Sequence, residues 1–278
     1  MATVSRRRRE KVSISSPPLE ACESRPVVFA ADSIGVVLPT TTGPLEILRD
    51  VSFDLGVGEI VGVVGRSGTG KTTLLRVLGG LVRATSGTVR LDGHPLDGPP
   101  ATAVTVFQDY GNALLPWRTV ERNVGLPLER RVGRQERRER VNEALRLVGL
   151  DGRGTDYPWR LSGGMQQRVQ IARALALRPR VLLMDEPFGA LDAMTKASLQ
   201  DQLLRVQEET GATIMFITHD IEEAIYLSDR VLVIAGTPGT ITQQLPTMLP
   251  RPRDRLATPE LPQYLRVRHR LYEALGEG

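Results

Sequence analysis

The residues Gly65-Arg66-Ser67-Gly68-Thr69-Gly70-Lys71-Thr72 separate two different patterns in this 278-residue chain. The apolar run Ile60–Val64 before them is typical of a buried parallel strand, and Leu74, Leu75 and Leu78 after them are spaced as in a helix. The spacing G-x-x-x-x-G-K-[ST] between a strand and a helix indicates a phosphate-binding loop. The dinucleotide fingerprint G-x-G-x-x-G does not fit, because the glycines here are spaced G-x-x-G-x-G. The predicted ligand is therefore a nucleoside triphosphate rather than NAD.

The residue types of this loop suit phosphate binding. Glycines let the backbone turn tightly and aim N–H groups at phosphate oxygens, and the following helix adds the positive end of its dipole. The ammonium of Lys71 can reach the β- and γ-phosphates, and the hydroxyl of Thr72 can ligate Mg²⁺. The residues predicted to hold the nucleotide here are Gly65, Arg66, Ser67, Gly68, Thr69, Gly70, Lys71, Thr72 and Thr73.

An acidic pair follows a second apolar strand pattern. Residues 181–184 are Val-Leu-Leu-Met, and Asp185 and Glu186 come directly after them. We expect Asp185 to hold Mg²⁺ through water and Glu186 to polarise an attacking water as a general base. An acid after an apolar strand is common on its own, so the prediction depends on its combination with Lys71.

The other patterns predict one α/β domain with a helical inset. Strand patterns at Thr213–Ile217 and 231–235, with helical spacers between strands, favour a parallel sheet built from right-handed crossovers. Residues 26–53 read as short strand-like pieces broken by a loop at 39–44. Residues from about 110 to 178 are expected to be mostly helical, because they contain amphipathic patterns with strongly charged faces.

Composition and charge exclude several classes of protein. Of the 36 basic residues 33 are arginine, and they stand against 32 acidic residues. The first 25 residues contain six basic groups and three glutamates, so this segment carries +3 of the net charge of +4. The net charge therefore identifies no partner for the rest of the chain. The sequence contains no run of 18 uncharged apolar residues, so it predicts no membrane-spanning helix. A single cysteine, Cys22, excludes a disulfide framework.

Three regions are expected along the chain. Residues 1–26 are predicted to be a disordered basic leader, which lacks the apolar segment of a secretory signal. We interpret its arginine run as a solvated tail or an electrostatic contact with anionic lipid headgroups. Residues 27–250 form the α/β domain, and residues 251–278 form a Pro/Arg-rich tail with a short helix from about 263 to 274.

The octapeptide Leu161-Ser162-Gly163-Gly164-Met165-Gln166-Gln167-Arg168 resembles the LSGGQ-like signature of the ATP-binding subunits of ABC transporters. Ser162 is a suitable N-cap, and the two glycines leave the start of a helix open to a phosphate. In this family two subunits face head to tail, and each ATP lies between the P-loop of one subunit and the Ser-Gly-Gly of the other. The resemblance implies a homodimer that ATP closes and hydrolysis releases, with ATP and Mg²⁺ as ligands.

The same resemblance implies a fold. It is a P-loop NTPase (RecA-like) parallel-sheet core with an antiparallel β subdomain and a helical subdomain that carries the signature. The resemblance covers roughly residues 27–250, which is one whole nucleotide-binding domain.

Single positions match further motifs of this family. Gln108 matches the glutamine that contacts Mg²⁺ and senses the membrane subunit, and Asp192, in the segment 190–192, matches the loop that crosses the dimer interface. His219 matches the histidine that contacts the γ-phosphate, so the implied catalytic residues are Glu186, His219 and Lys71. Family members usually have an aromatic residue upstream of the P-loop to stack on adenine. This chain has Leu38 there, so either Leu38 packs on the base or an insertion in the Thr-rich loop shifts the alignment.

Two segments, 114–120 and 249–254, look like those of importer ATPases for nitrate, sulfonate, taurine and related small anions. The implied function is an energy-coupling ATPase at the cytoplasmic face of the membrane. Its partners would be integral membrane permease subunits and, indirectly, an extracytoplasmic solute-binding protein. Trp117 is either a core aromatic or a docking residue for the permease.

The alternative is a soluble ABC-type ATPase acting on nucleic acid or ribosomes. Such proteins commonly carry two cassettes or a long coiled-coil insertion, and this chain has one cassette and a short helical inset. We therefore expect no nucleic-acid partner.

Overall fold

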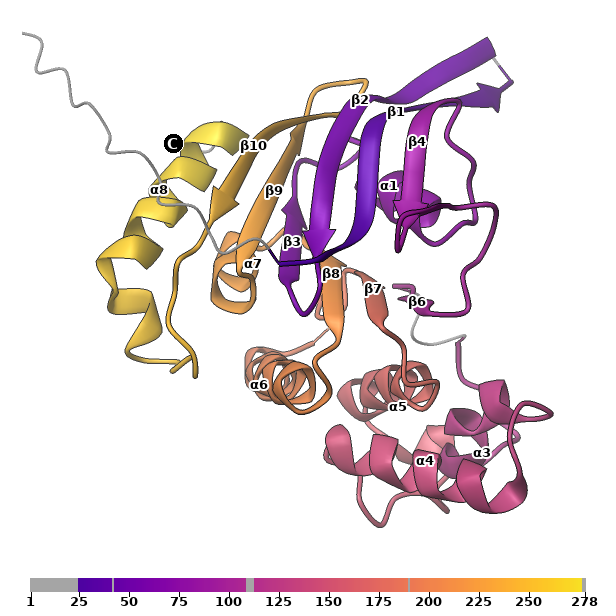
Figure 1. Cartoon of the computed structure of the whole chain (residues 1–278). Helices are drawn as coiled ribbons and strands as arrows, with labels where there is room; N and C mark the ends of the chain where they lie inside the picture. The colour runs from indigo at the N-terminus through magenta and orange to yellow at the C-terminus, as the bar shows by residue number, and fades with distance from the viewer. Residues whose placement is uncertain (1–24, 42, 109–112, 190, 277–278) are drawn as a thin grey trace, which may run out of the picture.

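The computed structural model describes residues 25–41, 43–108, 113–189 and 191–276 (Figure 1). Residues 1–24, which make up most of the predicted leader, and Ala190 lie outside the described residues. In the described part, two sheets face each other across one core, and the helices lie between them, on the far face and below.

The central sheet has the predicted parallel arrangement. Its strand order is β10-β9-β3-β8-β7-β6, all neighbours are parallel except the edge strand β10, and every residue of β3, β7 and β8 is buried. Burial on both faces explains why these strands are continuous apolar runs. The strands are β3 (Ile60–Val64), β6 (Ala103–Val106), β7 (Val181–Asp185), β8 (Thr213–Ile217), β9 (Arg230–Ala235) and β10 (Thr240–Pro246).

The second sheet is antiparallel and corrects one expectation. In place of short pieces, β1 (Val27–Thr40) and β2 (Gly43–Gly56) are two 14-residue strands that pair along their length, and Pro39 pairs with Pro44 at the end of the hairpin. The alternation is broken by bulges, such as the one at Ser33, whose φ is +47°, so the strand continues where the pattern stops. The strands β4 (Ser86–Leu91) and β5 (His94–Pro95) complete this sheet in the order β2-β1-β4-β5.

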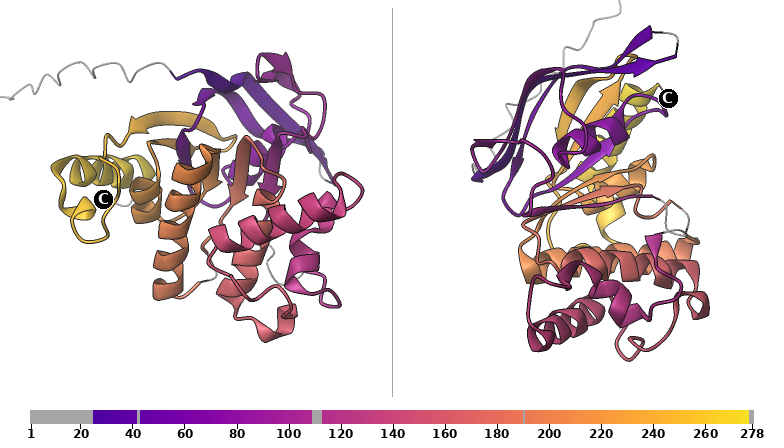
Figure 2. Two further views of the ribbon diagram at one scale, coloured as in Figure 1. Left: turned by 60° about the horizontal axis from the view of Figure 1, so that its bottom comes forward. Right: turned by 90° about the vertical axis from the view of Figure 1, so that its right-hand side faces the viewer.

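The helices divide into three groups around the central sheet. α1 (Lys71–Leu78) packs between the two sheets, where Leu74, Leu75 and Leu78 are buried as the spacing predicts. The helices α6 (Ala193–Thr210), α7 (Ile221–Leu227) and α8 (Pro262–Leu275) contribute to the core on the opposite face. The helices α3 (Val120–Val124), α4 (Arg134–Leu147) and α5 (Gly163–Leu175) form the inset, which lies below β6 and β7 (Figures 1 and 2).

Ion pairs attach the C-terminal tail to the domain. Arg251 donates to both carboxylate oxygens of Asp229 at 3.0 and 3.1 Å, and Arg255 Nε donates to Asp201 at 3.0 Å. The apolar face of α8, with Tyr264 and Leu271, is buried against α7, β9 and β10. None of the helices in the described part of the chain has the length and apolar composition that crossing a bilayer requires.

Candidate functional site

The phosphate loop lies at the carboxyl end of β3, where the chain enters α1. Two of its glycines are sterically required. A Cβ on Gly65 would lie 2.3 Å from the carbonyl oxygen of Ile234, and Gly70 has a φ of +90° with Leu48 Cδ2 only 2.7 Å from the position of a Cβ. Close contacts with β9 and β2 therefore require glycine at positions 65 and 70.

Lys71 is a buried ammonium beside this loop. Its side-chain nitrogen donates to the carbonyl oxygens of Gly65 at 2.7 Å and Arg66 at 2.9 Å, and the residue is 8% exposed. Burial lowers the pKa of Lys71, while the nearby carboxylates of Glu186 and Asp185 oppose the shift. A desolvated cation at a helix start, held by neutral carbonyls, suits a phosphate anion.

Asp185 ends β7 and lies beside the start of α1. The Thr72 hydroxyl donates to Asp185 Oδ1 at 3.3 Å, and Asp185 is 6% exposed. Burial raises the pKa of Asp185, and the hydrogen bond from Thr72 opposes the shift. A buried carboxylate beside a hydroxyl offers the hard oxygen ligands that Mg²⁺ prefers, so these two residues fit a magnesium ion.

Three consecutive strand ends bring Glu186, Gln108 and His219 together. Gln108 Nε2 donates to Glu186 Oε2 at 2.9 Å, and His219 Nδ1 lies 3.5 Å from the same oxygen. Glu186 has a φ of +46°, which is uncommon for a residue with a side chain, and its N–H donates to the carbonyl of Ile217. The Glu186 carboxylate thus lies between the Gln108 amide and the His219 imidazole.

Arg66 occupies a different place from the other loop residues. Its Nε donates to the carbonyl of Leu275 at 3.1 Å, so its guanidinium binds the C-terminal end of α8. Only its backbone carbonyl faces the loop, where it accepts from Lys71 and from Thr69 Oγ1. The remaining predicted loop residues are Ser67 and Gly68, which are exposed, and Thr73, which is half-buried in α1.

The signature residues form a separate group at the starts of α5 and α6. Ser162 caps α5 by accepting from Met165 N–H, and Asp192 caps α6 by accepting from Met194 and Thr195 N–H at 3.1 and 3.0 Å. Gly163 begins α5, and a Cβ on Gly164 would meet the Thr195 methyl at 2.3 Å. Within the described ranges, no side-chain hydrogen bond joins Ser162 or Asp192 to the phosphate loop.

Leu38 lies on β1, pairs with Leu45 and packs partly buried against the core between the sheets. Another residue of the hairpin, Ile47, lies against the phosphate loop. The Ile47 methyl and carbonyl oxygen are each 3.1 Å from the position of a Cβ on Gly70. The sequence contains no motif that could have identified Ile47, because its position depends on the long hairpin.

A comparison with protein-family models gives a match to the ABC transporter domain over residues 48–189. The chain belongs to the ABC transporter family. This ABC ATPase is 44% identical over 241 residues to the nitrate import ATP-binding protein NrtD of Synechococcus elongatus, covering 85% of the chain and 87% of NrtD. It is 48% identical over 217 residues to the aliphatic sulfonates import ATP-binding protein SsuB 1 of Xanthomonas axonopodis pv. citri, covering 77% and 85% of the two chains.

One relative is much longer than this ABC ATPase. The nitrate import ATP-binding protein NrtC of Synechococcus elongatus is 44% identical over 256 residues, and the match spans 90% of the chain but 38% of NrtC. Among solved structures, the dimeric ATP-binding cassette MJ0796 in a post-hydrolysis state with ADP and Pi superposes with a TM-score of 0.69 at 31% identity, covering 78% of this chain and 98% of that one. The predicted family and fold class are confirmed.

Proposed function

We propose that this ABC ATPase hydrolyses ATP with Mg²⁺ to drive an importer for a small anion such as nitrate, sulfonate or taurine. The observation that carries the proposal is the meeting of Lys71, Asp185, Glu186 and His219 at one edge of the central sheet. The names of the relatives, which include a taurine import ATP-binding protein TauB of Pseudomonas savastanoi pv. phaseolicola at 46% identity, support the class of transported solute.

In this proposal each residue has a defined task. Glu186 accepts a proton from the attacking water as the water oxygen bonds to the γ-phosphorus and the bond to ADP breaks. Lys71 and His219 stabilise negative charge on the transferring phosphoryl group. Thr72 and Asp185, with Gln108, would hold Mg²⁺, which supplies further charge neutralisation when bound.

The separate signature group supports a head-to-tail homodimer. Ser162, Gly163 and Gly164 lie at the start of α5, where Ser162 accepts from Met165 N–H of the same helix and Gly164 packs against Thr195 of α6. A second copy would bring this group against the bound nucleotide, together with Asp192. The dimeric state of the similar cassette is consistent with this arrangement.

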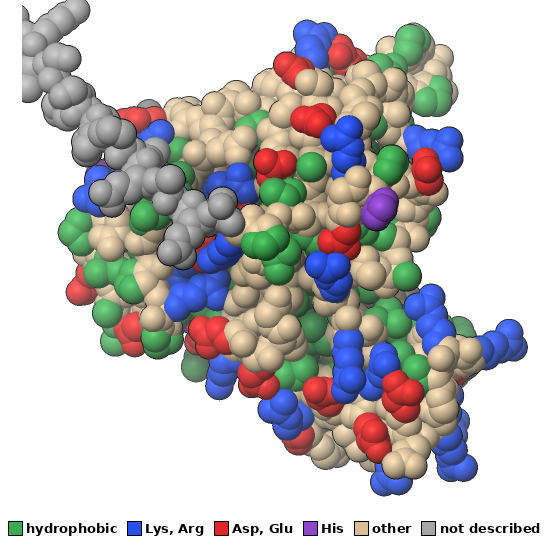
Figure 3. All heavy atoms as spheres, in the orientation of Figure 1, with side chains coloured by type: hydrophobic (Ala, Val, Ile, Leu, Met, Phe, Trp, Pro, Cys, Tyr) green, Lys and Arg blue, Asp and Glu red, His purple; other side chains and the backbone are tan. Residues whose placement is uncertain are grey.

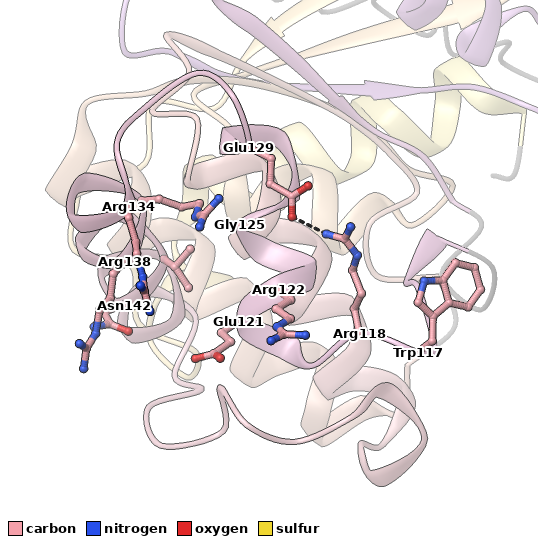
Figure 4. Close-up of a pocket in the computed structure, with 11 residues that line it drawn as sticks. Trp117, Arg118, Glu121, Arg122, Gly125, Glu129, Arg134, Arg138 and Asn142 are labelled. Carbon is pink, nitrogen blue, oxygen red and sulfur yellow. Dashed lines mark hydrogen bonds and ion pairs between the residues drawn. The ribbon is translucent and has the colours of Figure 1, made fainter.

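An exposed surface on the helical inset supports docking to a permease at the cytoplasmic face of the membrane. Trp117 is 71% exposed, which contradicts the core alternative, and lies at the edge of a groove of about 700 Å³ (Figure 4). Arg118 pairs with Glu129 across this groove (Figure 4), and Figure 3 shows basic side chains interspersed with acidic ones on the inset surface. The other charged residues lining it are Glu121, Arg122, Arg134, Arg137 and Arg138. We infer that a cytoplasmic helix of the permease binds here and that the solute-binding protein acts through the permease.

The Glu186→Gln variant tests the proposed ATPase. We expect turnover to fall by at least about a hundredfold while ATP remains bound, because the base is lost and the binding groups remain. ATP should then accumulate a dimer in gel filtration. A variant that stays monomeric with saturating ATP would contradict the nucleotide-sandwich dimer.

Reconstitution with permease subunits tests the transport role. We expect uptake of one anion in a panel containing nitrate, sulfonates and taurine, and Trp117→Ala should reduce uptake more than ATP hydrolysis by the isolated subunit. Equal loss of both activities would argue against Trp117 as a docking residue.

A further inference from the structure

Lys196 is one of only three lysines in a chain with 33 arginines, and it lies half-buried between α6 and α7. Its ammonium is 2.6 Å from Asp220 Oδ2 and 2.9 Å from Glu223 Oε2. Gln200 Nε2 also donates to that Glu223 oxygen, at 3.1 Å, and the Glu223 side chain is 2% exposed. We call Lys196, Gln200, Asp220 and Glu223 the α6–α7 ionic cluster.

The Lys196 ammonium stabilises the two neighbouring carboxylates of Asp220 and Glu223 in this partly buried site. Burial raises the pKa of Glu223, and Lys196 opposes that shift. Burial alone lowers the pKa of Lys196, but its hydrogen bonds to Asp220 and Glu223 outweigh this and raise it. Without Lys196 the carboxylates of Asp220 and Glu223, at the cap and in the first turn of α7, would repel each other without a cation from α6, so one of them must take up a proton or turn away from the other.

The cluster is also close in sequence to two predicted functional positions. Lys196 lies one turn into α6, and its N–H donates to the carbonyl of the cap residue Asp192 at 2.8 Å. Asp220 caps α7 by accepting from Glu223 N–H, and it directly follows His219. Any displacement of Asp220 therefore moves the backbone of His219, whose imidazole lies 3.5 Å from the Glu186 carboxylate.

We propose that Lys196 is a positioning residue that couples the Asp192 segment, which would face the second copy of the chain, to His219 at this chain's own phosphate site. This inference rests on the proposed ATPase and its dimer. Lys196 itself touches no reacting atom. When the second copy docks against Asp192, the shift of α6 reaches Asp220 through the ammonium and sets the position of His219.

The test compares three variants of the full chain by steady-state ATPase assay and thermal unfolding. Lys196→Met should lower the melting temperature, because Asp220 and Glu223 lose their cation, and in assays well below that temperature it should lower kcat about tenfold and reduce the Hill coefficient for ATP, with KM nearly unchanged. Lys196→Arg keeps the charge and should restore most of the activity. Arg205→Met removes a positive charge from an exposed site of the same helix and should behave as wild type.

A wild-type kcat and Hill coefficient in Lys196→Met would overturn the proposal, as would a loss of kcat that only follows the loss of folded protein. Asp220→Asn gives an independent measurement if Lys196→Met folds poorly. Asp220→Asn should lower kcat to a similar extent. The double variant Lys196→Met/Asp220→Asn should have a kcat no lower than that of either single variant, because both substitutions remove the same coupling. A wild-type chain without ATPase activity would refute the proposed function itself, whereas an active wild type with an equally active Lys196→Met would refute only the coupling.

Discussion

Gln108 Nε2 lies 2.9 Å from Glu186 Oε2, although the two residues are 78 positions apart in the sequence. The contact exists because β6 and β7 are parallel neighbours, so the residues that follow them meet at one edge of the sheet. The glutamine predicted to respond to the membrane subunit thus binds the predicted general base directly.

Replacing Gln108 should impair hydrolysis more than nucleotide binding. In Gln108→Ala the Glu186 carboxylate loses an amide donor, and we expect kcat to fall by about 5- to 50-fold with the affinity for ATP changed less than about threefold. Gln135→Ala, on the exposed face of α4, is the matched control. Steady-state kinetics with a nucleotide titration measures both quantities. A loss confined to affinity would place Gln108 outside the hydrolysis step.

Lys71→Met should remove nucleotide binding without weakening the fold. Burial lowers the pKa of Lys71, so its charge opposes folding, and a methionine of similar length should leave the melting temperature without nucleotide unchanged or higher. The stabilisation that ATP adds to the wild type should disappear. Thermal unfolding with and without MgATP measures this, with the exposed Arg83→Met as a control. Retained ATP-dependent stabilisation would refute the role of Lys71.

The ion pairs at Asp229 should make the fold sensitive to acid. Burial raises the pKa of Asp229, but the attraction of Arg251 and the hydrogen bond from Ile60 N–H outweigh it, so the pKa is lowered. A carboxylate with a lowered pKa in the folded state stabilises the fold above its unfolded pKa, and this stabilisation is lost as the pH falls through the folded value. We therefore expect the free energy of unfolding to decline below about pH 4.

The Asp229→Asn variant isolates this contribution. It should lose about 2–4 kcal/mol of unfolding free energy at pH 7, because it leaves Arg251 and Arg253 without their carboxylate, and the difference from wild type should narrow in acid. Urea unfolding across pH measures both effects. Glu209→Gln, which breaks the exposed pair with Arg146, should cost less than about 1 kcal/mol. A difference in unfolding free energy between Asp229→Asn and wild type that stays constant with pH would contradict this role of Asp229.

An aromatic residue at position 38 should strengthen ATP binding. Leu38 packs partly buried on the core side of β1, and its neighbour Val37 is 38% exposed. Because adjacent strand residues point to opposite faces, Leu38→Tyr should tighten binding in a nucleotide titration, whereas Val37→Tyr should not. Unchanged affinity in Leu38→Tyr would favour another residue of the hairpin, such as Ile47, beside the base.

Sequence patterns predicted those parts of the fold whose causes are local or periodic. The apolar runs of β3, β7 and β8 and the spacing of Leu74, Leu75 and Leu78 gave strands and a helix at the right places. The hairpin β1–β2 is longer than the sequence pattern predicts, because bulges such as that at Ser33 interrupt the alternation without ending the strand. The sequence does not predict the exposure of Trp117, since a single aromatic residue can pack in the core or lie on the surface without any change in the surrounding pattern.

By itself the sequence determined the strand–loop–helix unit from Ile60 to Leu78, because glycine spacing, a strand pattern and a helix pattern act within a few residues of each other. Only the tertiary structure decided that Arg66 binds the end of α8 at Leu275, and that Lys196 joins α6 to the residue after His219. These contacts depend on which strands pair and how helices pack over them. Such pairings bring together side chains from segments that are distant in the sequence, and no local sequence pattern predicts them.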